Sequence, residues 1–134
     1  MKLKIIVIDD EECIRDSFMW HLEDQGHEVI TAEEPKMCDV YCKQACSKDG
    51  PCGHVLFVDY HMPQMTGLDF IEQMAAYGCM IPPANKIIMS GNVADIDEDR
   101  VRNAGCQLVE KPLSLARIDA IIEAAKKNIE LLDS

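Results

Sequence analysis

Five polar residues stand at the ends of apolar runs in the sequence, and their types suit chemistry on a phosphoryl group. The pair Asp9–Asp10 follows KIIVI, Asp59 ends HVLFVD, Ser90 ends KIIMS, and Lys111 follows QLVE. Three carboxylates that lie close together repel one another unless a cation joins them. Oxygen ligands suit a hard ion such as Mg²⁺, which commonly keeps several waters and a phosphate oxygen. The residue types therefore favour a Mg²⁺ site.

The remaining groups of this set meet the needs of phosphoryl transfer. A lysine offers a point charge to a phosphate oxygen, and a serine hydroxyl can donate a hydrogen bond to another. A carboxylate can itself attack phosphorus to form an acyl phosphate. Phosphoryl transfer asks the protein mainly for positioning and charge neutralisation. The set therefore predicts a site at which a carboxylate accepts a phosphoryl group.

A second group of reactive side chains lies in CDVYCKQACSKDGPCGH, which runs from Cys38 to His54. Cys38 and Cys42 lie one helical turn apart and can be explained as small apolar side chains on a buried helix face. Cys46 and Cys52 are not covered by that explanation. A structural metal held by the four cysteines, a Cys46–Cys52 disulfide and plain thiols all stay open. The spacings match none of the paired-cysteine loops typical of zinc sites.

The composition is typical of an acidic, soluble globular protein. The chain has 134 residues, 48% of them hydrophobic, and a formal net charge of −11 at pH 7. This charge argues against direct nucleic-acid binding, which needs a basic footprint, and against an anionic membrane surface. No targeting segment or transmembrane run is visible, so a cytoplasmic location is predicted. There, the seven cysteines are expected to be thiols or ligands rather than structural disulfides.

Strand and helix patterns alternate along the chain, and these elements must position the polar residues. Strands are predicted at Lys4–Ile8, His27–Thr31, His54–Asp59, Lys86–Ser90 and Gln107–Glu110. Helices are predicted at Glu12–Gln25, from Pro35 to about Cys46, at Gly67–Tyr77, at Asp97–Ala104 and after Ser114. Alternating strands and helices imply one parallel sheet with right-handed crossovers and helices on both faces. Ligands bind at the carboxyl edge of such a sheet.

The last helix has the clearest pattern. Ser114 is predicted as its N-cap. Its buried stripe is predicted to consist of Leu115, Ile118, Ile122, Ala125, Ile129 and Leu132. Elsewhere, Trp20 falls off the apolar stripe of the first helix and is predicted to be partly exposed. The isolated cysteines predicted to serve packing are Cys13, Cys79 and Cys106, and the methionines predicted to pack in the core or in loops are Met62, Met65, Met74, Met80 and Met89.

In this order, the motifs resemble the receiver domain of response regulators, the phospho-accepting half of bacterial two-component signalling. The similarity runs through IIVIDDEE, VDYHMPQMTGLDF, IIMSG and VEKP, which together cover nearly the whole chain. The resemblance implies one receiver domain over residues 1–134 of the α/β class. Its fold would be a doubly wound (βα)5 flavodoxin-like domain, with a five-stranded parallel sheet in the order 2-1-3-4-5 and helices on both faces.

The resemblance also implies a role for each carboxylate. Asp59 would accept the phosphoryl group. Mg²⁺ would be held by Asp9, Asp10, Asp59 and the backbone carbonyl of His61. Met62, Pro63 and Gly67 would shape the loop beyond the acceptor.

The other strand-end residues receive roles in the same way. Lys111 would pair with the phosphoryl group, and its bond to Pro112 would be a cis peptide. Ser90 would be the switch hydroxyl that moves toward a phosphoryl oxygen. The family usually has Tyr or Phe three residues before the lysine, where this chain has Leu108, so its coupling to output is predicted to be altered. His61 and Asn92 occupy positions that modulate loss of the phosphoryl group in the family.

The predicted function is that of a stand-alone receiver which takes a phosphoryl group from a histidine kinase or phosphotransfer protein onto Asp59. Apart from its own phosphotransfer and autodephosphorylation, no enzyme activity is expected. The sequence ends after its fifth helix, so output is expected through a partner protein at the face of the fourth helix, fifth strand and fifth helix, or through onward phosphotransfer, unless the chain is a fragment of a longer protein. The alternative is a metal or redox sensor that uses the Cys38–Cys52 cluster. An external phosphatase is disfavoured, because His61 stands where such enzymes need a second carboxylate.

Overall fold

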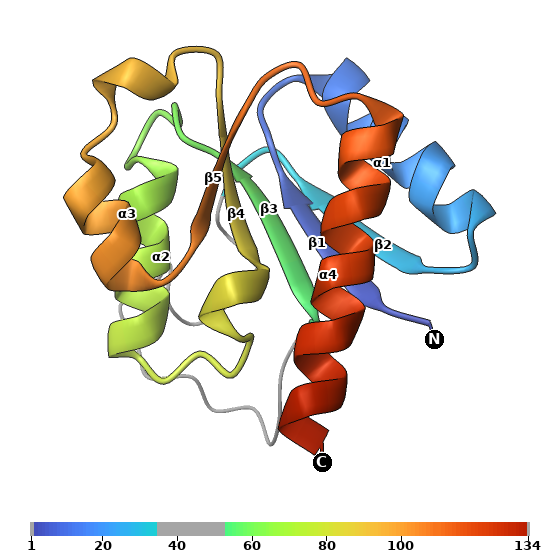
Figure 1. Ribbon diagram of the computed structural model, residues 1–134. Coiled ribbons are helices and arrows are strands. Elements are labelled where there is room, and N and C mark those ends of the chain that lie inside the picture. Colours follow the sequence, from blue (N-terminus) through green and yellow to red (C-terminus); the bar gives the residue numbers. More distant parts are fainter. Residues whose placement is uncertain (1, 35–52, 134) are drawn as a thin grey trace.

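Five parallel strands form the central sheet of the computed structural model, which describes residues 2–34 and 53–133 (Figure 1). They are β1 (Lys4–Ile8), β2 (Glu28–Ala32), β3 (Val55–Asp59), β4 (Lys86–Ser90) and β5 (Gln107–Glu110). Their order across the sheet is β2-β1-β3-β4-β5, and every neighbouring pair is parallel. The predicted sheet and strand order are confirmed.

The described α-helices lie on both faces of this sheet. They are α1 (Glu12–Asp24), α2 (Gly67–Ala76), α3 (Glu98–Ala104) and α4 (Leu115–Asp133). Helices α1 and α4 cover one face, whereas α2 and α3 cover the other (Figure 1). The helix predicted from Pro35 to about Cys46 lies outside the described residues. Helices α3 and α4 therefore correspond to the fourth and fifth helices of the predicted arrangement.

The central strands are buried on both faces, and alternate side chains fill two core layers. In β1, Ile5 and Val7 pack with the α1 and α4 layer, whereas Ile6 and Ile8 pack with the α2 layer. Burying one large aliphatic side chain contributes roughly 1.5–3 kcal/mol. A shift of one residue in register would exchange the two sets of side chains. The core therefore fixes the register that places the strand ends at one edge.

Polar caps fix the ends of the later helices. Thr66 and Asp69 form a reciprocal capping box at the start of α2. Asp97 caps α3, which ends at Gly105 in the left-handed conformation with φ of 75°. The Ser114 hydroxyl accepts a hydrogen bond from the backbone N–H of Arg117, which confirms the predicted cap of α4. These caps set where the loops of the carboxyl edge stop and the helices begin.

The buried stripe of α4 differs from the prediction at its first member. Ile118, Ile122 and Ala125 are buried as expected, and Ile121 is buried beside them. Leu115, in contrast, is 54% exposed. It lies in the first turn of the helix, where it lines an open cleft beside α1 instead of entering the core.

The isolated residues differ in how far they are exposed to solvent. Trp20 is 73% exposed, in line with the prediction for this residue. The prediction of a packing role is wrong for Cys13, which is exposed in the first turn of α1. Met80, predicted to pack in the core or in a loop, lies in the loop after α2 and is 54% exposed. Cys106 is buried, and its thiol lies 3.8 Å from the backbone oxygen of Val101.

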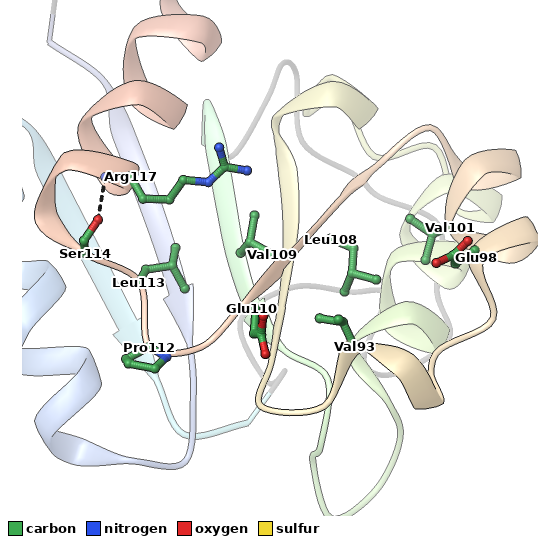
Figure 2. Close-up of a pocket in the computed structure, with 10 residues that line it drawn as sticks. All are labelled: Val93, Glu98, Val101, Leu108, Val109, Glu110, Pro112, Leu113, Ser114 and Arg117. Carbon is green, nitrogen blue, oxygen red and sulfur yellow. Dashed lines mark hydrogen bonds between the residues drawn. The ribbon is translucent and has the colours of Figure 1, made fainter.

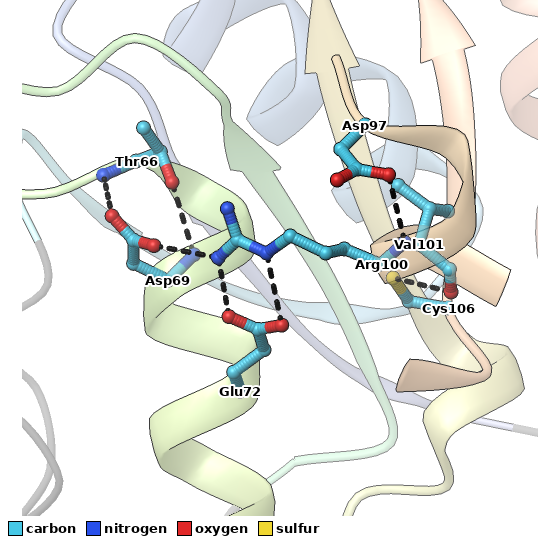
Figure 3. Close-up of polar contacts among 7 residues, drawn as sticks. All are labelled: Thr66, Asp69, Glu72, Asp97, Arg100, Val101 and Cys106. Atoms are coloured by element: carbon cyan, nitrogen blue, oxygen red, sulfur yellow. Dashed lines mark hydrogen bonds and ion pairs between the residues drawn. The ribbon is translucent and has the colours of Figure 1, made fainter. Parts of the chain in front are cut away.

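An ion-pair cluster joins α2 to α3 (Figure 3). The guanidinium of Arg100 donates hydrogen bonds to both carboxylate oxygens of Glu72 and to Oδ1 of Asp69, the last at 2.8 Å. The hydrogen bond from Arg100 holds the pKa of Asp69 below its ordinary value. Because Asp69 also belongs to the capping box, Arg100 links the start of α2 to α3.

His27 is a buried histidine whose titration should make stability depend on pH. It is 5% exposed, and its Nδ1 accepts a hydrogen bond from the backbone N–H of Leu3 at 3.1 Å. Burial, together with the nearby charge of Lys126, lowers the pKa of His27 below its ordinary value of 6.5. Below pH 6.5 the unfolded chain therefore takes up a proton that the folded chain resists. The stability that neutral His27 contributes is complete above that pH and declines as the pH falls below it.

We expect the replacement His27→Asn to flatten this part of the pH profile. The Oδ1 of asparagine can take the place of Nδ1 as acceptor for Leu3 but does not titrate in this range. The measurement is thermal unfolding of both proteins at a series of pH values from neutral to mildly acidic. Wild type should lose more stability than the variant across this range. Parallel profiles would show that His27 is not the group responsible.

Candidate functional site

Three carboxylates converge at the carboxyl edge of the sheet. Asp9 and Asp10 follow β1, and Asp59 ends the neighbouring strand β3. Each offers one oxygen, and these oxygens all lie within 4.8 Å of one another. Asp9 and Asp59 are buried, whereas Asp10 is exposed. Two adjacent parallel strands thus bring together residues that are 50 positions apart in the sequence.

Lys111 enters the same cluster from the end of β5. Its Nζ lies 2.8 Å from Asp9 Oδ2, 3.2 Å from Glu11 Oε1 and 3.5 Å from Asp59 Oδ1. Burial of the ammonium opposes its charge, but its hydrogen bond and attraction to Asp9, helped by Asp59 and Glu11, outweigh burial and raise the pKa of Lys111. The lysine is therefore held as a cation among carboxylates.

The ionised form of the Asp59 carboxyl is disfavoured in spite of the nearby Lys111. Burial is the largest cause that raises the pKa of Asp59, and the negative charge of Asp9 is the next. Lys111 and a hydrogen bond from the backbone N–H of His61 act in the opposite direction but do not prevail. Negative charge is thus in excess at this edge.

Asp9 is fixed on several sides. Its backbone N–H donates to Ala32 at the end of β2, and its Oδ1 accepts from the backbone N–H of Glu11. Its backbone carbonyl accepts a hydrogen bond from Arg15 at 2.7 Å. Its Oδ2 is buried and lies 2.8 Å from the Nζ of Lys111.

These features fit a hard divalent cation. Oxygen-only donors are close together, and the summed negative charge of the three carboxylates exceeds the single positive charge of Lys111. The predicted ligands Asp9, Asp10 and Asp59 are therefore placed together. The backbone carbonyl of His61 was also predicted as a ligand, and His61 lines the same cleft.

The hydroxyl predicted as a switch lies at the end of the next strand. Ser90 is fully buried at the end of β4, and its Oγ accepts a hydrogen bond from the backbone N–H of Asn92 at 3.0 Å. The backbone oxygen of Ser90 accepts from the N–H of Lys111 at 2.8 Å, which joins the loops after β4 and β5. The Lys111–Pro112 peptide is cis, as the resemblance implied.

A cleft opens beside these residues and gives solvent and ligands access to Asp59. Its volume is about 460 Å³, and its lining includes Asp10, Asp59, His61, Gly91 and Lys111. Sequence reasoning missed Glu11 and Arg15 as parts of this site. Arg15 lies six positions after Asp9 and belongs to α1, and only the structure shows that its guanidinium bends back to the strand end.

Leu108, which stands at the usual aromatic position, lines a groove on another face (Figure 2). The groove has a volume of about 680 Å³ and lies between β5, α3 and the start of α4. Val93, Val101 and Leu113 supply further apolar lining. The structure thus has an open groove on the face that was predicted to bind a partner.

The predicted cysteine cluster, Cys38, Cys42, Cys46 and Cys52, lies outside the described residues. His54, the last residue of the same stretch, uses its Nδ1 to accept a hydrogen bond from the backbone N–H of Lys4 at 2.8 Å. This contact secures the start of β3 against β1.

The fold and the strand-end carboxylates together define a flavodoxin-like α/β domain with a cluster of acidic residues at its carboxyl edge. A family model described as "Response regulator receiver domain" matches residues 5–123. The chain therefore belongs to the response regulator receiver family, a family of two-component signalling domains that pair with histidine kinases and downstream effectors. Within residues 2–34 and 53–133, every helix is too short or too polar to cross a membrane.

Named relatives support this membership. The alkaline phosphatase synthesis transcriptional regulatory protein PhoP of Bacillus subtilis is 26% identical over 98% of this chain and 51% of its own length. Full-length FixJ from B. japonicum has a TM-score of 0.74 at 26% identity, over 95% of this chain and 59% of FixJ. A receiver domain protein from Clostridium thermocellum has a TM-score of 0.71 at 24% identity, over 96% of this chain and 98% of its own. The chain spans about half the length of the curated relatives it matches.

Proposed function

We propose that this receiver domain accepts a phosphoryl group on Asp59 in a Mg²⁺-dependent reaction. The observation that carries the proposal is the convergence of three carboxylates within 4.8 Å, with Lys111 3.5 Å from Asp59. The donor is a phosphohistidine of a histidine kinase or phosphotransfer protein. Membership of the receiver family supports that choice of donor.

In the proposed reaction, one carboxylate oxygen of Asp59 forms a bond to phosphorus. The bond from phosphorus to the imidazole nitrogen of the donor breaks, and that nitrogen keeps the electron pair. Asp9, Asp10, Asp59 and the His61 carbonyl would hold Mg²⁺, which when bound supplies charge neutralisation to the phosphoryl oxygens. Autodephosphorylation then returns the domain to its starting state, because water attacks the acyl phosphate and releases inorganic phosphate.

Lys111 and Ser90 then respond to the new charge. Lys111 forms an ion pair with a phosphoryl oxygen, because its ammonium already lies beside Asp59. The Ser90 hydroxyl turns from the N–H of Asn92, its partner at rest, to donate to another phosphoryl oxygen. Both residues are joined through the Lys111 N–H and the Ser90 carbonyl, so movement of one loop affects the other.

The proposed output is a change in the face formed by α3, β5 and α4, where a partner protein binds. Phosphorylation shifts an equilibrium between two conformations of this face. The groove beside Leu108 lies on this face, with Glu98 and Glu110 among its lining residues (Figure 2). Because Leu108 has no polar tip, the coupling differs from that in relatives with an aromatic residue there.

The test is incubation with Mg²⁺ and acetyl phosphate, followed by intact mass measurement. We expect wild type to gain one phosphoryl group, with acetate as the leaving product. Chelation of the metal should prevent the gain, because the repulsion among the carboxylates is then uncompensated. If wild type stays unmodified by both acetyl phosphate and a phosphorylated histidine kinase, the proposal is wrong. Equal labelling of Asp59→Asn would also contradict it.

A further inference from the structure

Arg15 is a cation at the carboxyl edge that lies outside the phosphoryl-transfer set. It belongs to the first turns of α1, and its side chain is only 13% exposed. Its Nη1 donates a hydrogen bond of 2.7 Å to the backbone carbonyl of Asp9. Its Nη2 lies 3.7 Å from Oε1 of Glu33, which follows β2. The guanidinium, which belongs to α1, therefore bridges the ends of the adjacent strands β1 and β2.

The carbonyl that Arg15 holds belongs to the peptide that links Asp9 to Asp10. The other groups of Asp9 are fixed separately, since its N–H donates to Ala32 and its Oδ1 accepts from the N–H of Glu11. Asp10 has no such anchors: it is exposed and makes no hydrogen bond or ion pair with the residues that the structure describes. The orientation of the Asp9–Asp10 peptide is therefore what directs the carboxylate of Asp10.

We propose that Arg15 is a positioning residue for the Mg²⁺ site. By holding the Asp9 carbonyl, it keeps the linking peptide in the orientation that turns both carboxylates toward the cation. This inference rests on the proposed function, which places Mg²⁺ at Asp9, Asp10 and Asp59. Arg15 itself touches neither the cation nor the phosphoryl group.

Positioning and simple electrostatics predict opposite effects when the charge of Arg15 is removed. A cation this close to the carboxylates repels Mg²⁺, so its loss alone would make Mg²⁺ bind more tightly. Loss of the hydrogen bond to the Asp9 carbonyl frees the peptide, so Mg²⁺ would bind more weakly. Groups that orient metal ligands typically change metal affinity roughly 10-fold or more when they are mutated. The direction of the change therefore identifies the role.

The experiment is a calorimetric titration of the metal-free protein with Mg²⁺, for wild type, Arg15→Met and Arg15→Gln. We expect both variants to bind Mg²⁺ roughly 10-fold more weakly than wild type. Arg102→Met is the matched control, since it removes a cation from an exposed ion pair with Asp99 on α3. Its Mg²⁺ affinity should match that of wild type. Thermal unfolding is also measured with and without Mg²⁺. The midpoint without Mg²⁺ reports general stability, and the rise of the midpoint on adding Mg²⁺, the Mg²⁺-induced shift, reports binding.

The outcomes distinguish this inference from the function on which it rests. If wild type binds Mg²⁺ and both Arg15 variants bind it equally well or more tightly, Arg15 does not position the ligands. Arg15→Gln provides the result by itself if Arg15→Met does not fold. If wild type fails to bind Mg²⁺ at all, the proposed Mg²⁺-dependent function is what fails. A smaller Mg²⁺-induced shift in the Arg15 variants, with Arg102→Met unchanged, supports positioning.

Discussion

Asp59→Asn is expected to abolish phosphoryl acceptance and at the same time to stabilise the metal-free protein at neutral pH. The amide cannot attack phosphorus, so intact mass after treatment with acetyl phosphate should not change. Asparagine has almost the same shape, but it removes a negative charge that burial and the charge of Asp9 both oppose. The variant loses the attraction to Lys111, but the raised pKa of Asp59 means that the opposing effects are larger. The gain in free energy of unfolding should be on the order of 1 kcal/mol.

The pH dependence of this gain has a definite sign. A carboxyl whose pKa is raised in the folded state holds its proton more strongly when folded than when unfolded. Stability that depends on protonated Asp59 is therefore present at low pH and is lost as the pH rises through the folded pKa. Wild type and Asp59→Asn should have similar stability in acid and diverge toward neutral pH.

Chemical denaturation at several pH values, without Mg²⁺, measures this divergence. Asp10→Asn is a suitable control, because it removes the same charge from an exposed member of the cluster and should stabilise less. Mg²⁺ should narrow the gap between wild type and Asp59→Asn, since the cation offsets the same repulsion. A variant no more stable than wild type at neutral pH would mean that Lys111 already compensates the charge of Asp59.

The placement of the site could be predicted from the sequence because it depends on topology. Each polar residue of the set follows a run of apolar residues, and parallel strands bring their carboxyl ends to one edge. That reasoning needs no knowledge of side-chain conformation. It correctly brought the carboxylates of Asp9, Asp10 and Asp59 to within 4.8 Å of one another, with Lys111 beside them.

Contacts that depend on side-chain conformation could not be predicted in this way. The bond from Arg15 to the Asp9 carbonyl requires the guanidinium to turn back along α1. The contact of 2.7 Å between His21 and Asp119 joins α1 to α4 across 98 residues of sequence. Neither contact leaves a periodic pattern in the sequence. The exposure of Leu115 was missed for a related reason, since periodicity does not show where a helix passes an open cleft.

Gly67 shows how a role implied by family resemblance acquires a physical cause. It is the first residue of α2, and it does not have a positive φ, so backbone conformation does not require glycine there. The requirement is space. A Cβ built at Gly67 would lie 2.7 Å from the backbone oxygen of Asp59 and 3.3 Å from the Cα of Tyr60. Both neighbours are backbone atoms, which cannot turn aside as a side chain can.

Gly67→Ala is therefore expected to destabilise the protein and to slow phosphorylation. Alanine favours a helix over glycine by about 1 kcal/mol, but forcing the backbone apart costs typically 1–3 kcal/mol. The helix preference should thus be offset or exceeded, and the atoms that must move belong to the acceptor itself. Because a small misplacement of reacting groups can cost up to about 100-fold in rate, labelling by acetyl phosphate should slow by roughly 10-fold or more.

Gly91→Ala provides the matched comparison for stability, since a Cβ at Gly91 meets nothing within 4 Å. Denaturation and the rate of phosphoryl gain should be measured on the same preparations of Gly67→Ala and wild type. A slower rate of phosphoryl gain with little change in stability would show that the substitution acts by displacing Asp59. Wild-type stability and rate in Gly67→Ala would show that the loop after β3 has room to move, and that the close approach of α2 does not hold the acceptor in place.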